Sequence, residues 1–168
     1  KTNIGSRVTY YNNVKIRNLK NQKSEITQVK GLPKNPKLSN ISWSPDQKRI
    51  ALTNTTETGV ELWVLELENG SVTKLTESNL NSNIGSVINW FSDSENMLVK
   101  MISNNRRPLI DTDKIVPDGP TISTNFGEKA QNRTYQDLLK NKFDEHNFEQ
   151  LSTSTIYKVS IDGSVKKW

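Results

Sequence analysis

Apolar and polar residues alternate along two similar stretches of the chain. In the first stretch, residues 40–55, apolar residues alternate with polar neighbours on both sides of a Ser-Pro-Asp turn (Ile41, Trp43, Ile50 and Leu52). A two-residue period on both sides of a turn predicts an antiparallel β-hairpin. The second stretch, INWFSDSENMLVK at residues 88–100, repeats this pattern. The sequence therefore predicts the same hairpin twice.

Two further strands are predicted after the first hairpin. Residues 60–67, VELWVLEL, place one set of apolar side chains on each face of a strand: Val60, Leu62 and Val64 on one, and Trp63, Leu65 and Leu67 on the other. The dipeptide Asn69-Gly70 readily takes the positive φ that a tight hairpin requires. Residues 72–76 then form a fourth strand, which completes a four-stranded antiparallel meander.

The spacing of the two hairpins indicates a repeat. Trp43 and Trp90 are 47 residues apart, close to the roughly 40–45 residues of one β-propeller blade. The third and fourth strands of the second unit reappear only at residues 154–168, where Asp162-Gly163 matches Asn69-Gly70. Gly70 lies 27 residues after Trp43, whereas Gly163 lies 73 residues after Trp90, so the second unit contains about 46 additional residues.

We therefore predict an all-β fold, a partial β-propeller of four-stranded antiparallel blades with a loop-plus-short-helix insertion in one blade. Residues 1–168 would form part of one propeller domain. The outer part of a first blade is expected at 1–37, as two strands around Asn21-Gln22, with a second blade at 38–80. The third blade is expected at 84–168, with its insertion at about 104–153.

The predicted blades lead to two expectations about packing. Trp43 and Trp90 occupy equivalent positions on first strands, so we expect both side chains to be largely buried between adjacent blades. A propeller closes with about 4–8 blades, and the chain begins at Lys1 without an initiator Met. We therefore expect a fragment of a longer protein, with self-association through its uncovered blade faces or strand edges.

The insertion changes character along its length. Residues 108–132 contain three prolines and two glycines, which predicts an extended loop. Residues 133–151 have a helical pattern, in which Thr134 and Asp137 have the spacing of a capping box. An apolar stripe recurs at helical spacing: Tyr135, Leu138, Leu139 and Phe143. This stripe predicts packing against a neighbouring element, and a binding surface is the alternative.

Composition excludes several classes of function. Lys and Arg total 23 against 18 Asp and Glu, but the basic residues are scattered, so nucleic-acid binding is not expected. The chain contains no cysteine, which rules out disulfides and thiolate metal sites. No apolar run approaches the roughly 18 residues of a membrane-spanning helix.

Three segments of the sequence resemble known peptidases. The Ser-Pro-Asp hairpin resembles the propeller repeat of TolB-like proteins and of prolyl oligopeptidase relatives. Two other segments resemble a single branch of these peptidases. They are residues 116–166, from VPDGPTISTNFGEKAQNRTYQ to STIYKVSIDGSVK, and residues 31–54, GLPKNPKLSNISWSPDQKRIALTN. They resemble the N-terminal propeller of the glutamyl endopeptidase-like branch of the prolyl oligopeptidase family, which has plastid members in plants and exported members in Bacteroidetes-type bacteria. The resemblance covers nearly the whole chain and implies a propeller that caps an α/β-hydrolase domain with a Ser-Asp-His triad.

The chain departs from that family in its catalytic residues. It contains no G-x-S-x-G nucleophile elbow. Its single histidine, His146, has no serine assigned to it by any motif. His146 and Glu149 have the one-turn spacing of metal ligands, but two ligands without a third make a weak site. We therefore expect no catalytic residue, no metal and no cofactor in this chain.

Five charged residues are the candidate substrate-binding residues. Dipeptidyl peptidases of the resembling family use propeller acids to hold the free amine of a substrate, which singles out Asp144 and Glu145; a solvated helix surface is the alternative. Arg106, Arg107 and Arg133 are candidates for attracting acidic peptides, because guanidinium groups pair well with carboxylates.

The sequence as a whole predicts a non-catalytic N-terminal propeller segment of an exported serine peptidase, located in the periplasm or outside the cell. Its expected partners are peptide substrates and an α/β-hydrolase domain that is absent from this chain, and neither a nucleic acid nor a membrane. The propeller would restrict which peptides reach that domain. The alternative is a stand-alone TolB-like propeller that acts as a periplasmic protein-interaction module.

Overall fold

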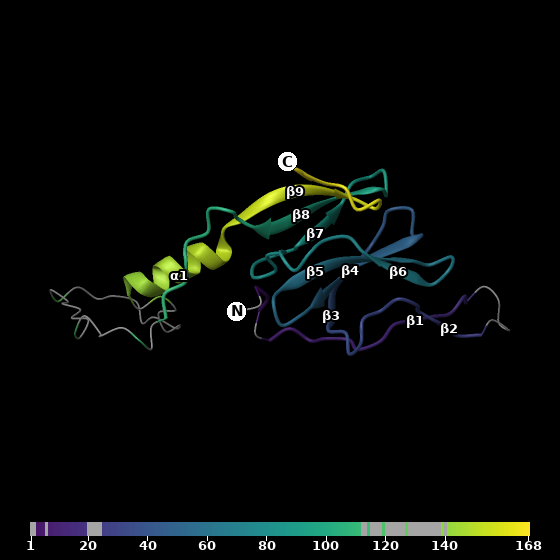
Figure 1. The fold of residues 1–168 in the computed structure, drawn as a ribbon, viewed down its shortest axis with the longest axis horizontal. Helices are drawn as coiled ribbons and strands as arrows, with labels where there is room; N and C mark the ends of the chain where they lie inside the picture. The colour runs from purple at the N-terminus through teal and green to yellow at the C-terminus, as the bar shows by residue number, and fades with distance from the viewer. Residues whose placement is uncertain are drawn as a thin grey trace. The chain divides into compact units, whose positions relative to one another are not determined.

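The structure is a computed structural model that describes residues 3–5, 7–19, 25–111, 114, 119, 127, 139 and 141–168. These residues form short antiparallel strands and one helix (Figure 1). The strands are β1 (Lys15–Ile16), β2 (Thr27–Gln28), β3 (Leu38–Trp43), β4 (Arg49–Thr55), β5 (Val60–Glu66), β6 (Ser71–Lys74), β7 (Ile88–Trp90), β8 (Asn96–Ile102), β9 (Ser154–Ser160) and β10 (Val165–Lys167), and the helix is α1 (Lys142–Ser152).

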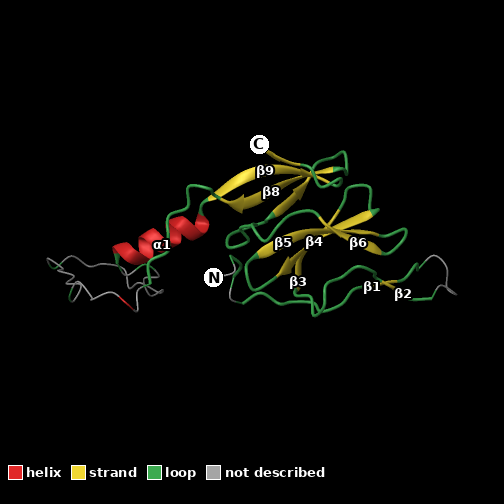
Figure 2. Ribbon diagram, viewed as in Figure 1, coloured by secondary structure: helices red, strands yellow, loops and turns green. Residues whose placement is uncertain are grey.

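The chain divides into two compact units. The sheet unit comprises Lys1–Arg106 and Ser152–Trp168, and the insertion unit comprises Arg107–Leu151. Within the sheet unit the strands form two four-stranded antiparallel sheets (Figure 2). The first sheet has the order β3-β4-β5-β6, and the second has the order β7-β8-β9-β10. β1 and β2 form a separate two-stranded sheet, and none of the three sheets closes on itself within the described residues.

The hairpins that begin the two four-stranded sheets have the same register. Trp43 pairs with Ile50 across β3 and β4, and Trp90 pairs with Met97 across β7 and β8, seven residues later in both sheets. The residue four positions after each tryptophan has a positive φ, 59° at Gln47 and 60° at Ser94. The predicted repeat of the hairpin is therefore confirmed around its turn, whereas β3 differs from β7 in a register shift between Ser39 and Ser42.

An aspartate fixes each hairpin turn. The Asp46 Oδ1 atom accepts hydrogen bonds from the Ser44 hydroxyl (2.6 Å) and the Lys48 amide (3.0 Å). The Asp93 Oδ1 atom accepts hydrogen bonds from the amides of Glu95 (2.9 Å) and Asn96 (3.0 Å). Asp side chains that bind the backbone two residues ahead favour tight turns, which explains why the same turn forms from different sequences.

The outer hairpins also match. Leu65 pairs with Val72 in the first sheet, and Val159 pairs with Val165 in the second, so the second turn is one residue shorter. Both turns contain a glycine with positive φ, 68° at Gly70 and 86° at Gly163, a conformation that glycine adopts without steric cost. The additional residues of the second sheet lie between β8 and β9, as the sequence predicts.

The two four-stranded sheets share one apolar layer. Side chains from facing sides of both sheets and from the connection between them form this central layer: Ala51, Val60, Leu62, Val64, Leu75, Leu80, Val87, Ile88, Met97, Val99, Met101 and Val159. Each of these side chains is buried. At about 25 cal/mol per Å² of apolar surface, burial of this kind is the main favourable term in folding.

The opposite face of the first sheet packs against the N-terminal segment. Leu38, Ile50, Leu52 and Leu65 are buried there, and partly buried apolar side chains cover them: Val14, Ile16, Val29, Leu32, Trp63, Leu67 and Val72. β1 and β2 pair as predicted on either side of residues 20–24. The predicted turn at Asn21-Gln22 lies outside the described residues.

The helix differs from the predicted one. α1 covers only Lys142–Ser152, and the Asn141 side chain caps its N-terminus by accepting hydrogen bonds from the amides of Phe143 and Asp144, both at 2.9 Å. Asn141 was not the predicted cap. Thr134, Tyr135, Asp137 and Leu138 lie outside the described residues, and Leu139 is exposed.

No helix in the described part of the chain is long and apolar enough to span a membrane.

The prediction that both repeat tryptophans are largely buried is wrong for Trp43. Trp90 is half-buried, contacts the central layer, and donates a hydrogen bond from Nε1 to the Ser42 carbonyl (3.2 Å). Trp43 is 56% exposed. The physical reason is that Trp90 has β3 beside it, whereas the preceding two-stranded sheet does not extend over Trp43.

The two tryptophans therefore give a matched pair of stability measurements. Replacing Trp90 by Ala should lower the free energy of unfolding by about 2–3 kcal/mol, because it opens a gap beside the central layer. The Trp43→Ala variant should lose less than about 1 kcal/mol, as expected for an exposed position. Urea unfolding followed by circular dichroism measures both values. Equal losses in the two variants would contradict the described packing.

Candidate functional site

Two of the three candidate arginines lie among the described residues. Arg106 is half-buried in the sheet unit and donates a hydrogen bond from Nη1 to the Asn3 side-chain oxygen. Burial lowers the pKa of Arg106. Arg107 belongs to the insertion unit, where its Nη2 atom lies 3.3 Å from Glu149 Oε2. Arg133 lies outside the described residues. Arg106 and Arg107 therefore bind different side chains, and their attraction of acidic peptides stays a prediction.

The predicted acidic pair lies at the start of the helix. Asp144 and Glu145 occupy the first turn of α1, where a negative charge is stabilised by the positive end of the helix dipole. Asp144 is half-buried and Glu145 is exposed. This position accounts for both acids as part of a helix start, and their proposed contact with a substrate amine stays a prediction.

Polar side chains hold the helix of the insertion unit against residues 107–110. Asn147 donates to the Ile110 carbonyl and accepts from the Ile110 amide, both at 2.8 Å. The buried Gln150 side chain accepts a hydrogen bond from the Arg107 amide (2.8 Å). His146 Nε2 lies 3.0 Å from the Pro108 carbonyl, and it must donate because a carbonyl only accepts. His146, Asn147 and Gln150 share one helix face, a polar pattern that the search for apolar stripes missed.

The contact with Pro108 gives His146 a structural role. It engages the Nε2 atom of the ring, and among the described residues no serine hydroxyl binds His146. In the part of the chain that the structure describes, no group of three or more His, Asp or Glu side chains is placed to hold a metal ion.

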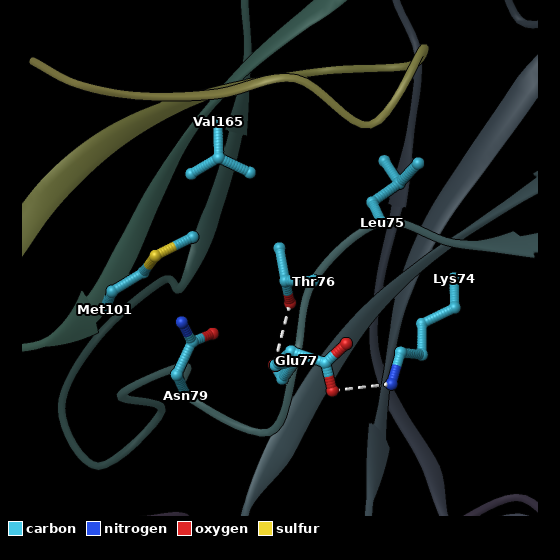
Figure 3. Close-up of a pocket in the computed structure, with 7 residues that line it drawn as sticks. All are labelled: Lys74, Leu75, Thr76, Glu77, Asn79, Met101 and Val165. Carbon is cyan, nitrogen blue, oxygen red and sulfur yellow. Dashed lines mark hydrogen bonds and ion pairs between the residues drawn. The ribbon is translucent and has the colours of Figure 1, made fainter.

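A pocket of about 300 Å³ lies in the sheet unit, between the end of β6 and strands β8 and β10 (Figure 3). The sequence did not predict it. Its lining is mixed, with Leu75, Met101 and Val165 as apolar residues and Lys74, Thr76, Glu77 and Asn79 as polar ones. This volume is at the lower end for ligand pockets, so the pocket suits a single side chain or a molecule of that size.

A buried glutamate organises the charged edge of this pocket. Glu61 Oε2 accepts hydrogen bonds from Asn54 Nδ2 (3.0 Å) and Trp63 Nε1 (2.9 Å). Its other oxygen lies 3.3 Å from Lys74 Nζ, which also pairs with Glu77 at 2.9 Å. Burial alone would raise the pKa of Glu61, but the hydrogen bonds from Asn54, Trp63 and Lys74 outweigh it and hold the pKa below its ordinary value. The hydrogen bond to Glu77 is the largest cause of the raised pKa of Lys74.

The pocket offers binding chemistry and lacks a catalytic pair. Thr76 is the hydroxyl residue of its lining, and its Oγ1 atom already donates to the Glu77 carbonyl (3.0 Å) and accepts from the Leu62 amide (3.0 Å). A hydroxyl nucleophile needs an adjacent base, and no histidine is among the described residues that line the pocket. The lining can contact an aliphatic group and hydrogen-bond a polar one.

Comparison with curated proteins identifies peptidases as relatives. The chain is 30% identical over 181 aligned residues to a probable chloroplastic glutamyl endopeptidase of Arabidopsis thaliana, and 28% identical over 178 to a protein of the same description from Oryza sativa subsp. japonica. Both alignments cover 98% of this chain but only 18% and 19% of the relatives. The chain thus spans about a fifth of the length of these curated relatives. No family profile matches it.

Two solved structures of acylaminoacyl peptidases are also similar. The enzyme from Pyrococcus horikoshii is 25% identical, with a TM-score of 0.38 over 62% of this chain and 14% of that one. An acylaminoacyl peptidase in complex with Z-Gly-Gly-Phe-chloromethyl ketone is 21% identical, with a TM-score of 0.44 over 91% of this chain and 20% of that one. Both TM-scores are below 0.5, so the similarity to peptidases is argued from the sequence relatives. Glutamyl endopeptidase-like and acylaminoacyl peptidases of the prolyl oligopeptidase family are therefore what this chain is similar to.

The lowered pKa of Glu61 predicts a pH-dependent stability. We expect Glu61→Gln to lower the free energy of unfolding by about 1–3 kcal/mol at neutral pH, since an amide cannot satisfy all the donors that the carboxylate binds. The unfolded-state pKa is near 4.5. A carboxyl group with a lowered folded-state pKa stabilises fully above its unfolded-state pKa and loses this effect as the pH falls through the folded-state value. The difference between wild type and variant should therefore shrink below about pH 4.5.

Glu77→Gln is the matched control, because the Glu77 side chain is 83% exposed and its ion pair is at the surface. Such pairs contribute about 0–1 kcal/mol. Urea titrations between pH 3 and pH 7 compare the two variants. A Glu61→Gln difference that stays constant across this range would contradict the assigned role of the carboxylate.

Proposed function

We propose that the chain is a non-catalytic propeller segment of an exported serine peptidase of the prolyl oligopeptidase family, glutamyl endopeptidase-like branch. In this proposal the two four-stranded sheets are consecutive blades, and the two-stranded sheet is the outer part of the blade before them. The propeller limits which peptides reach an α/β-hydrolase domain elsewhere in the full-length protein. Export to the periplasm or the medium and the Bacteroidetes-type assignment are parts of the proposal that derive from the resemblance alone.

The observation that carries the proposal is the repeated register of the two sheets. Trp43 and Trp90 pair in the same register within their hairpins, and Gly70 and Gly163 have a positive φ in the two outer turns, of which the second is one residue shorter. Face-to-face stacking of such sheets about an axis is how a propeller is built. Similarity to glutamyl endopeptidases over 98% of the chain then favours a peptidase over other proteins that contain propellers.

The first strands of the two sheets support the access-limiting role. Beyond the Trp90 contact with β3, the Asp46 amide donates to Ser94 Oγ at 3.0 Å, so the two hairpin turns are also joined. First strands surround the central channel of a propeller. A channel whose surrounding strands are joined by hydrogen bonds selects substrates by size, because a wide substrate enters only if these hydrogen bonds break.

The first test compares the 168-residue chain with the full-length protein. Glutamyl and prolyl reporter peptides should be hydrolysed by the full-length protein and not by the chain, because the chain lacks the nucleophile elbow. A serine-directed phosphonate should abolish the activity. A full-length protein without activity, or one whose gene encodes no G-x-S-x-G motif followed by Asp and His, would contradict the proposal and favour the interaction module.

The second test addresses access. In the full-length protein, Leu62→Ala loosens the central layer, whereas Ile84→Ala changes an exposed residue and serves as the control. We expect Leu62→Ala to raise kcat/KM for casein severalfold relative to a short reporter peptide, with no change in the control. The same ratio in both variants and the wild type would mean that these sheets do not limit access.

A further inference from the structure

The pocket between the end of β6 and strands β8 and β10 is not used by the proposed function. Its volume is about 300 Å³, and all the residues that line it belong to the sheet unit. The arrangement of its apolar contacts, its charges and its uncommitted hydrogen-bonding atoms indicates which class of small molecule it can bind.

The apolar and polar side chains of the pocket are separated. Leu75 and Met101 are buried and Val165 is exposed on the outer strand β10. In Figure 3 these three side chains lie in the upper part of the view, whereas those of Glu77 and Asn79 lie in the lower part. A pocket of this kind suits a ligand with an aliphatic chain and one polar end.

The single cation of the lining is already neutralised. Lys74 Nζ lies 3.3 Å from Glu61 Oε1 and 2.9 Å from Glu77 Oε2. One positive charge against two negative charges leaves one negative charge in excess at this edge of the pocket. An anionic ligand would have to compete with both carboxylates for Lys74, so the charges favour a cation.

The uncommitted polar atoms of the pocket include two acceptors. In the part of the chain that the structure describes, nothing binds Glu77 Oε1 or the side-chain amide of Asn79. Both side chains are exposed, so they can turn toward a ligand. The Thr76 hydroxyl, in contrast, already donates to the Glu77 carbonyl and accepts from the Leu62 amide. Carboxylate and amide oxygens accept the hydrogen bonds that an ammonium group donates.

We infer that this pocket binds a primary alkylammonium group on an unbranched chain of about four or five carbons, the chemistry of a lysine side chain. The methylene groups contact Leu75, Met101 and Val165, and the ammonium group donates to Glu77 Oε1 and to Asn79 Oδ1. The inference is independent of the proposed function, because binding at this pocket involves no reacting group.

Other ligands of the same length fit less well. An alcohol makes the same apolar contacts but leaves the excess negative charge without a partner. A carboxylate adds a third negative charge beside Glu61 and Glu77. Affinity should therefore fall in the order n-pentylammonium, 1-pentanol, pentanoate. A ligand of so few atoms binds weakly, with a dissociation constant in the millimolar range.

Methyl NMR of the full-length protein, isotope-labelled at the methyl groups of methionine, measures this binding. Met97 and Met101 are the two methionines of the chain, and Met97→Leu and Met101→Leu assign their signals. We expect n-pentylammonium chloride, titrated against sodium chloride at equal concentration, to shift the Met101 signal saturably. Met97 is buried and does not line the pocket, so its signal should stay in place. An unmoved Met101 signal, or equal affinities for pentylammonium and pentanol, would overturn the inference.

Two glutamate variants test the ionic contact. Glu77→Gln removes the charge from an exposed side chain of the lining, and it should weaken pentylammonium binding about fivefold without changing the affinity for pentanol. Glu68→Gln is the matched control, because Glu68 is exposed in the turn before β6 and does not line the pocket. Equal pentylammonium affinities in the two variants would contradict the assigned role of Glu77.

A competition experiment distinguishes the source of the amine. A capped tripeptide with a central lysine is added to the pentylammonium complex, and its counterpart with a central norleucine serves as the control. Competition by the lysine peptide alone identifies a side chain of a peptide or protein as the ligand, and competition by neither identifies a free amine. Both results support binding of the alkylammonium group. Equal competition by the norleucine peptide would overturn it.

Discussion

The apolar layer between the two four-stranded sheets is the interaction on which the rest of the structure depends. A twisted sheet this small is stable only when it packs against another element. The first sheet has apolar side chains on both faces, with Leu62 and Val64 toward the second sheet and Ile50 and Leu52 toward the N-terminal segment. The first sheet therefore packs against a neighbour on each face, the second sheet on one side and the N-terminal segment on the other.

The need for apolar packing on both faces of the first sheet also explains why its accessible groups lie at its edges. The charged groups around Glu61 and the small pocket lie at the outer edge of the first sheet, where β6 ends and the chain crosses to β7. The exposed Ile41 and Trp43 lie on the first strand. The insertion unit depends on a different interaction, because His146, Asn147 and Gln150 bind the backbone of residues 108–110 and Arg107. Within its described residues, these hydrogen bonds hold the helix against residues 107–110.

Local patterns predicted much of the fold and little of the candidate site. Alternation around the Ser-Pro-Asp turn and the glycines at 70 and 163 located the strands, because these features depend on nearby residues alone. The exposure of Trp43 depends on which strands lie beside it, which a repeat pattern cannot report. The pocket was missed because Lys74, Met101 and Val165 come from three separated segments. The Asn141 cap was missed because a capping box at Thr134 fitted the sequence equally well.

Native-state hydrogen exchange in low concentrations of urea tests most directly whether the shared layer makes the two sheets one cooperative unit. Amides of β4–β5 and β8–β9 report the opening free energy of each sheet separately. The account predicts one common opening free energy for both pairs of strands, and Leu62→Ala in the first sheet should lower it equally in the second. Amides of β8–β9 that open independently, and that are unchanged by Leu62→Ala, would contradict it.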